Sequence, residues 1–99
     1  MNENDFIIYA SSKSDTVKFA SLISNRFMNE YNSSGIDALI EVRAIGAGAV
    51  NQAIKSIALA RGFVSSSDVN LICIPAFGEF TMKDGSMKSG MRLIIRAGE

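Results

Sequence analysis

The stretch EVRAIGAGAVNQAIKSIALARG, residues 41–62, comes closest to a known chemical motif in this sequence. Gly46 and Gly48 join an expected strand to an expected helix, which is how many phosphate-binding turns begin. Asn51 replaces the third glycine of a dinucleotide fingerprint, and Lys55 comes one helical turn too late for a P-loop. Two interpretations remain open. The glycines allow a tight turn and close packing of helix on sheet, or the free amides near Gly48 hold an anion such as a nucleic-acid phosphate.

Residues suited to catalysis are few. The sequence has no histidine, so the usual general base near neutral pH and the commonest metal ligand are both missing. The serine runs Ser11–Ser14 and Ser65–Ser67 lack an activating partner and are typical of caps and turns. The acidic residues occur singly, which does not suggest a paired-carboxylate or magnesium site. We therefore expect a protein that is not an enzyme and that has no cofactor, metal or small-molecule substrate.

Lysine and arginine offer a second kind of chemistry, the binding of phosphates. Lys13 precedes the first expected helix, Arg43 lies near the end of the second expected strand, and Lys83, Lys88 and Arg92 lie in or beside the last hairpin. Basic loops and a projecting hairpin could grip nucleic-acid phosphates along one edge of the molecule, and a dimer would double the contacts. The candidate nucleic-acid site is Lys13, Arg43, Gly48, Asn51, Lys83, Lys88 and Arg92. The alternative is an ordinary solvated surface.

Composition limits the classes of protein to which the chain can belong. Its 99 residues suit a single domain, 1–99, and 47% apolar with 20% charged residues is typical of a globular protein. Ten basic residues balance ten acidic ones, so any affinity for nucleic acid must come from a local patch. The start MNENDF does not resemble a secretory signal, and the longest apolar run, LICIPAF, is too short to span a bilayer. The single Cys73 in this run favours a reduced compartment, and we expect a cytoplasmic protein that does not bind membranes.

Hydrophobic periodicity places the elements that position these residues. It predicts a strand at 6–12, a helix capped by Ser14 or Asp15 and running to about Tyr31, and a strand at 38–45. A second helix is expected to open after Gly48 and to end before Gly62. The near-continuous apolar run VNLICIPAF predicts a strand in the middle of the sheet, its ladder loosening at Pro75. The turn KDGS and the segment MRLIIRA complete a last hairpin.

This order of elements, β-α-β-α-β-β, predicts an α/β two-layer sandwich, with two helices on one face of a mixed four-stranded sheet. The other face of the sheet would be uncovered and would carry apolar residues such as Ile45 and Ile94. Because monomers rarely expose a large apolar patch, we expect a homodimer or higher homo-oligomer formed through this face.

The run Ala44–Phe77, AIGAGAVNQAIKSIALARGFVSSSDVNLICIPAF, resembles the stage V sporulation protein S family. Its Ala-Ile-Gly-Ala-Gly-Ala turn, Asn-Gln-Ala helix start, Ala-Arg-Gly-Phe-Val helix end and Ile-Pro-Ala-Phe strand end match the family in order and spacing. The match is looser over the first strand, the Ser-Lys-Ser turn and the last strand. The resemblance implies an Alba-like fold and a cytosolic, non-enzymatic regulator of sporulation, with nucleic-acid binding inferred from other proteins of that fold.

Two functions are consistent with these observations. The first is a dimeric regulator that binds DNA or RNA through the basic loops and the last hairpin. In Alba-type domains such loops approach nucleic acid, which by position implies Lys13, Arg43, Lys83 and Lys88. The alternative is a protein-interaction or assembly module that forms homo-oligomers without nucleic acid.

Overall fold

Four strands and two long helices make up the computed structural model of the chain, which describes residues 6–98. In chain order the elements are β1 (Ile7–Ala10), α1 (Thr16–Ser34), the short 3-10 helix η2 (Gly35–Asp37), β2 (Leu39–Ala44), α2 (Ala47–Ser65), β3 (Asn70–Thr81) and β4 (Met87–Gly98). The order predicted from the sequence is confirmed.

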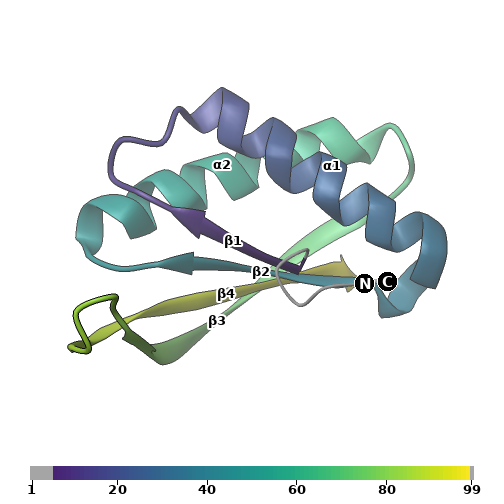
Figure 1. The fold of residues 1–99 in the computed structure, drawn as a ribbon. Helices are drawn as coiled ribbons and strands as arrows, with labels where there is room; N and C mark the ends of the chain where they lie inside the picture. Colours follow the sequence, from purple (N-terminus) through teal and green to yellow (C-terminus); the bar gives the residue numbers. More distant parts are fainter. Residues whose placement is uncertain (1–5, 99) are drawn as a thin grey trace.

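The four strands form one mixed sheet in the order β1-β2-β4-β3. Strand β1 pairs with β2 in parallel, while β4 is antiparallel to both of its neighbours. Both helices cover the same face of this sheet (Figure 1). The predicted two-layer sandwich is therefore confirmed.

The core lies between the sheet and the helices. Alternate residues of the two central strands point into it, as the period of two requires, and Ile40, Val42 and Ile95 are fully buried. From the helix layer, Phe27 of α1 and Ala53 of α2 are also fully buried. The same alternation turns Glu41, Arg43 and Arg92 toward the open face of the sheet.

Helix α1 begins and ends with recognisable caps. Asp15 is the N-cap, and its carboxylate accepts a hydrogen bond from the Lys18 amide at 3.0 Å. The predicted end near Tyr31 is wrong, because the helix continues to Ser34. Gly35 then closes it with a φ of 60° and donates its amide to the Tyr31 carbonyl.

Helix α2 also extends beyond its predicted bounds. It begins at Ala47, after Gly46 adopts a φ of 92°, and it does not end before Gly62 but runs on to Ser65. Val64 is 2% exposed, so burial of its side chain in the core stabilises a last turn that the glycine alone would disfavour.

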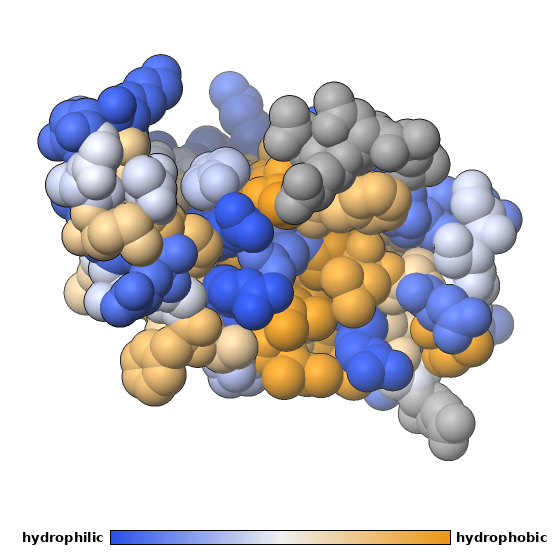
Figure 2. All heavy atoms as spheres, turned by 60° about the horizontal axis from the view of Figure 1, so that its bottom comes forward, coloured by the Kyte–Doolittle hydropathy of each residue, from blue (hydrophilic) through white to orange (hydrophobic). Residues whose placement is uncertain are grey.

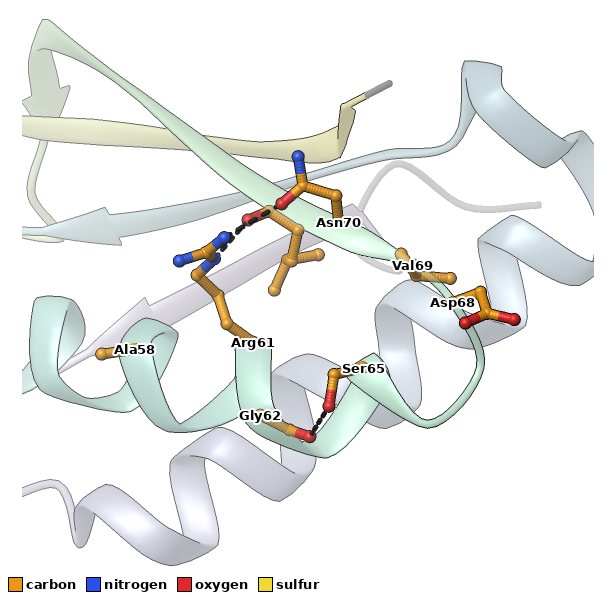
Figure 3. A pocket seen from close by; sticks show the side chains of 8 residues that line it. Ala58, Arg61, Gly62, Ser65, Asp68, Val69 and Asn70 are labelled. Atoms are coloured by element: carbon orange, nitrogen blue, oxygen red, sulfur yellow. Dashed lines mark hydrogen bonds between the residues drawn. The ribbon is translucent and has the colours of Figure 1, made fainter.

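Strand β3 lies at an edge of the sheet, which corrects the predicted central position. Its pairing with β4 also runs through Pro75 without interruption. A hydrogen bond from α2 shows which backbone groups of β3 point away from β4. Nε of Arg61 donates to the Leu71 carbonyl at 2.8 Å, beside a hollow of about 540 Å³ at the start of β3 (Figure 3). The Leu71 carbonyl therefore faces the free edge of the sheet. The backbone N and C=O of every second residue after it face the same edge, including those of Pro75. Proline there costs no ladder bond.

The face of the sheet opposite the helices is open, and Figure 2 shows apolar side chains spread over it around a group of polar ones. Tyr9 is 61% exposed, Leu39 45% and Ile74 42%, whereas the ring of Phe80 is almost fully covered. The predicted uncovered face is confirmed, although charged side chains occupy its middle.

Candidate nucleic-acid interface

Three segments far apart in the sequence meet at one end of the molecule. The parallel strands β1 and β2 end there, so the loop at 11–15 and the turn at 45–46 lie together. Strand β4 runs the opposite way and meets the end of β2 at the pair Ala44 and Met91. The tip of the β3–β4 hairpin therefore projects past β2 at this same end (Figure 1).

A hollow of about 450 Å³ lies where the ends of β1 and β2, the 11–15 loop and the start of α2 meet. It is lined by Tyr9, Ala10, Ser11, Ser12, Arg43, Ile45, Gly46, Gly48 and Ala49. A Cβ at Gly48 would lie 2.9 Å from Cβ of Ser12, closer than two such atoms can approach. The predicted tight turn is thus confirmed, with Gly46 providing the positive φ, whereas the close approach at Gly48 is to the 11–15 loop and not to the sheet. Binding of an anion by the α2 amides stays a prediction.

Hydrogen bonds hold the 11–15 loop in one shape. The hydroxyl of Ser14 accepts from the Ser11 amide at 3.0 Å, and that of Ser11 accepts from the Lys13 amide at 3.2 Å. From α2, the Gln52 side-chain amide donates to the Ser14 carbonyl at 2.9 Å. The serine run therefore forms a turn, as predicted, and presents an exposed Lys13 beside the start of α2.

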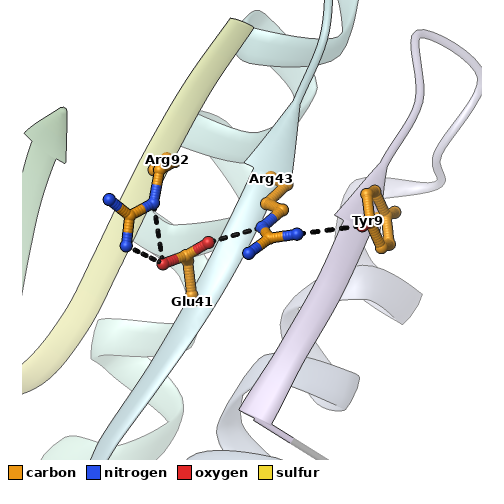
Figure 4. A network of polar contacts seen from close by, with 4 residues as sticks. All are labelled: Tyr9, Glu41, Arg43 and Arg92. Atoms are coloured by element: carbon orange, nitrogen blue, oxygen red, sulfur yellow. Dashed lines mark hydrogen bonds and ion pairs between the residues drawn. The ribbon is translucent and has the colours of Figure 1, made fainter. Parts of the chain in front are cut away.

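A polar network crosses the open sheet face next to the hollow (Figure 4). Glu41 is 7% exposed and accepts hydrogen bonds from Nε of Arg43 and from Nη2 and Nε of Arg92, at 2.7 and 3.0 Å for the latter two. Nη1 of Arg43 donates to the Tyr9 hydroxyl at 3.1 Å, and its guanidinium carbon lies 5.2 Å from the centre of the Phe80 ring. One buried carboxylate thus orients two cations.

This arrangement keeps Glu41 ionised. Burial disfavours the charged carboxylate, but the hydrogen bonds from Arg92 and Arg43, together with their charges, outweigh burial and hold the pKa of Glu41 below its usual range. The hydrogen bond to Glu41 also raises the pKa of Arg43. The network therefore carries a net positive charge near neutral pH.

We expect Glu41→Gln to lower the free energy of unfolding by about 1–3 kcal/mol at pH 7, because Arg43 would lose its charged partner while staying largely covered. Since the folded-state pKa of Glu41 is depressed, its contribution is present above the ordinary glutamate pKa and is lost as the pH falls through the folded-state value. Urea unfolding of the unaltered protein and of Glu41→Gln, from pH 7 down to about pH 3, should show the difference between their free energies of unfolding becoming smaller. Glu79→Gln, at an exposed position of β3, is the control, and an equal loss at every pH would contradict this role.

The remaining predicted residues differ in their placement. Lys83 and Lys88 are exposed at the hairpin, on the same end of the molecule as Lys13. Asn51 lies one turn along α2, outside the lining of the hollow, and donates to the Gln52 side chain at 3.4 Å. Arg92 is committed to Glu41. Lys13, Arg43, Gly48 and the hairpin lysines are thus brought to one end, whereas Asn51 is peripheral.

Sequence reasoning missed Tyr9, Glu41 and Phe80. Alternation along the strands predicts that Glu41 and Arg43 share a face, but only the register places Arg92 beside them. Within residues 6–98, no group of three or more histidine, cysteine, aspartate or glutamate side chains is arranged to hold a metal ion. No helix in that range is long and apolar enough to cross a membrane.

The strand order, the two helices on one face and the projecting hairpin define an Alba-like α/β sandwich. The chain is similar to the structure of Alba from Thermoplasma volcanium, with a TM-score of 0.56 and 16% sequence identity. The match covers 91% of this chain and 98% of the Alba chain. At that identity the likeness shows the fold. The model of the family described as stage V sporulation protein S (SpoVS) matches residues 7–98. The chain belongs to the stage V sporulation protein S family, and the resemblance seen in the sequence is confirmed.

Proposed function

We propose that this protein is a cytoplasmic, non-enzymatic regulator that binds DNA or RNA as a dimer. The observation that carries the proposal is the meeting of the 11–15 loop, the start of α2 and the β3–β4 hairpin at one end of the molecule. Lys13, Lys83 and Lys88 are exposed there, with Arg43 beside them. Clustering of this kind provides local affinity for phosphates even though the formal net charge is zero.

The nature of the cations supports contact with a phosphate backbone. Lys13 and Lys83 sit in exposed loops and Lys88 is exposed at the start of β4. At such positions a flexible ammonium group can follow the phosphates without a fixed geometry. Arg43, in contrast, is held by Glu41 and Tyr9 and offers a guanidinium in a fixed orientation. Flexible lysines that provide affinity, together with one rigid arginine that positions the nucleic acid, form a suitable combination for nucleic-acid binding.

The dimer would form through the flank where β3 runs beside α2. On the helix-facing side of β3, burial falls steadily from Leu71, at 1% exposed, through Cys73 and Pro75 to Phe77, at 88%. Ile54 of α2, 47% exposed, adds to this apolar flank. The flank is a better candidate than the middle of the open face, because the charged network there would have to be desolvated.

Salt dependence of binding tests the proposal directly. Fluorescence anisotropy would follow labelled duplex DNA, single-stranded DNA and single-stranded RNA between about 50 and 200 mM salt. Three lysine–phosphate contacts from one protomer predict a slope of log K against log salt of about −2.7 for duplex DNA and about −2.1 for a single strand, and a dimer about twice these values. Even the slope of about −2.1 weakens binding by roughly 20-fold over this range. Failure to bind any of the three at the lowest salt would refute the proposal.

The apolar flank also favours a second candidate, an assembly module that forms homo-oligomers without nucleic acid. Light scattering separates the two, because an assembly module would have a stable oligomeric mass and no salt-sensitive affinity for nucleic acid. A stable dimer that binds nucleic acid would support the first proposal.

A further inference from the structure

We infer that the basic end of the molecule, where Lys13, Arg43, Lys83 and Lys88 lie, binds an unpaired nucleotide whose base stacks on Tyr9. The favoured partner is then single-stranded nucleic acid. The inference rests on the proposed function and names its substrate class. It starts from the ring of Tyr9, which is 61% exposed on the open face although it belongs to a strand of the sheet.

The Tyr9 ring is anchored at its hydroxyl. Nη1 of Arg43 donates to this oxygen at 3.1 Å, and Arg43 is held in turn by Glu41 (Figure 4). The backbone of Tyr9 is paired with that of Arg43 across β1 and β2. The ring therefore has little conformational freedom to lose when a base stacks on it, which is the condition for a useful stacking platform.

The surroundings of Tyr9 fit the remainder of a nucleotide. Tyr9 and Arg43 both line the hollow of about 450 Å³, together with Ser11 and Ser12. Nη2 of Arg43 makes no hydrogen bond with any residue between 6 and 98, so it can donate to a base edge or to a phosphate. Lys13 follows directly in the same loop. An aromatic ring, an oriented guanidinium and a lysine are the groups that single-strand binders combine.

A duplex cannot use this platform. Its bases are already stacked on one another, so their faces are closed to a side chain on a sheet, and only its phosphates could reach the basic loops. Tyr9 should therefore contribute to single strands and not to duplexes, whereas the hairpin lysines should contribute to both.

Tyrosine fluorescence can report on stacking at Tyr9, because the sequence has two tyrosines and no tryptophan. Tyr31→Phe leaves Tyr9 as the one emitter and keeps an aromatic ring against Phe27. Titration with a single-stranded oligothymidine should quench this emission to saturation, and a blunt DNA hairpin should not. Tyr9→Phe, in which Tyr31 is the one emitter, is the reciprocal control and should show no such quenching.

Anisotropy measures the energetic effect. Tyr9→Leu should weaken single-strand binding by roughly tenfold and leave duplex binding within about twofold. Tyr9→Phe should weaken single-strand binding less than Tyr9→Leu does, because it retains the ring although it loses the hydroxyl that anchors it. Far-ultraviolet circular dichroism would confirm that both variants are folded, and the quenching experiment does not depend on Tyr9→Leu.

The outcomes distinguish this inference from the proposed function. If single strands bind with the expected salt slope but neither quench Tyr9 nor lose affinity in Tyr9→Leu, the inference is wrong and the proposed function stands. Equal weakening of single-strand and duplex binding by Tyr9→Leu would also overturn the inference, because it would indicate a structural role. If neither form of nucleic acid binds at about 50 mM salt, both proposals fail.

Discussion

Reversing both hairpin charges, Lys83→Glu with Lys88→Glu, is expected to weaken nucleic-acid binding by roughly 100-fold or more, because attraction to two phosphates would be replaced by repulsion. Both lysines are exposed at the hairpin, and neither is ion-paired within the part of the chain that the structure describes. The slope of log K against log salt should become shallower by about 2 for each protomer that engages the nucleic acid. Anisotropy at several salt concentrations measures both quantities.

A matched control separates the effect of where the two charges lie from the effect of the change in net charge. Lys55→Glu with Arg96→Glu changes the net charge by the same amount, but Lys55 lies on the outer side of α2 and Arg96 near the far end of β4. We expect this control to weaken binding only slightly, through long-range repulsion that salt screens. If the control weakened binding as much as the hairpin variant, the hairpin would have no specific role. Thermal unfolding should be similar for both, because all four positions are exposed.

Placing a carboxylate on the apolar flank is expected to separate the dimer. In Phe77→Glu or Ile54→Glu a charge would be buried without a partner at the interface, and this should raise the dimer dissociation constant by roughly 100-fold or more. The mass from light scattering should fall from about two chains to one. Nucleic-acid affinity should fall with it, because the two basic ends would no longer bind together.

Leu59→Glu is the control for the flank. Leu59 is also an exposed apolar residue of α2, 39% exposed, but it lies about 140° around the helix from Ile54. Its substitution should leave the mass unchanged. If Leu59→Glu were monomeric and Phe77→Glu dimeric, the flank would not be the interface. The dimer would then form through the outer surface of the helices.

The register of the sheet determines the candidate site in a way that separate motifs do not. Glu41, Arg43 and Arg92 are ordinary charged residues along the sequence, and Tyr9 is one aromatic residue of a short strand. The pairing of β1 with β2 and of β2 with β4 brings all four onto one face. The Glu41 network then orients Arg43, and Arg43 orients Tyr9.

Local patterns in the sequence determined the number, type and order of the elements. Alternation in β2 and the helical spacing in α1 and α2 depend on which side chains must leave water, and this is a property of neighbouring residues. Asp15 as a cap and Lys83–Ser86 as a hairpin turn follow from equally local chemistry. The layer arrangement followed from these elements and from the handedness of their connections.

The tertiary structure decided what depends on distant partners. Packing of Val64 in the core carries α2 past Gly62, and the position of β4 between β2 and β3 makes β3 an edge strand in which Pro75 is harmless. Strand order, register and the burial of Glu41 between two arginines arise from interactions between residues far apart in the chain. Local periodicity carries no information about such interactions, so the sequence by itself determined the elements and the basic residues, and only the fold placed them around Tyr9 and Arg43.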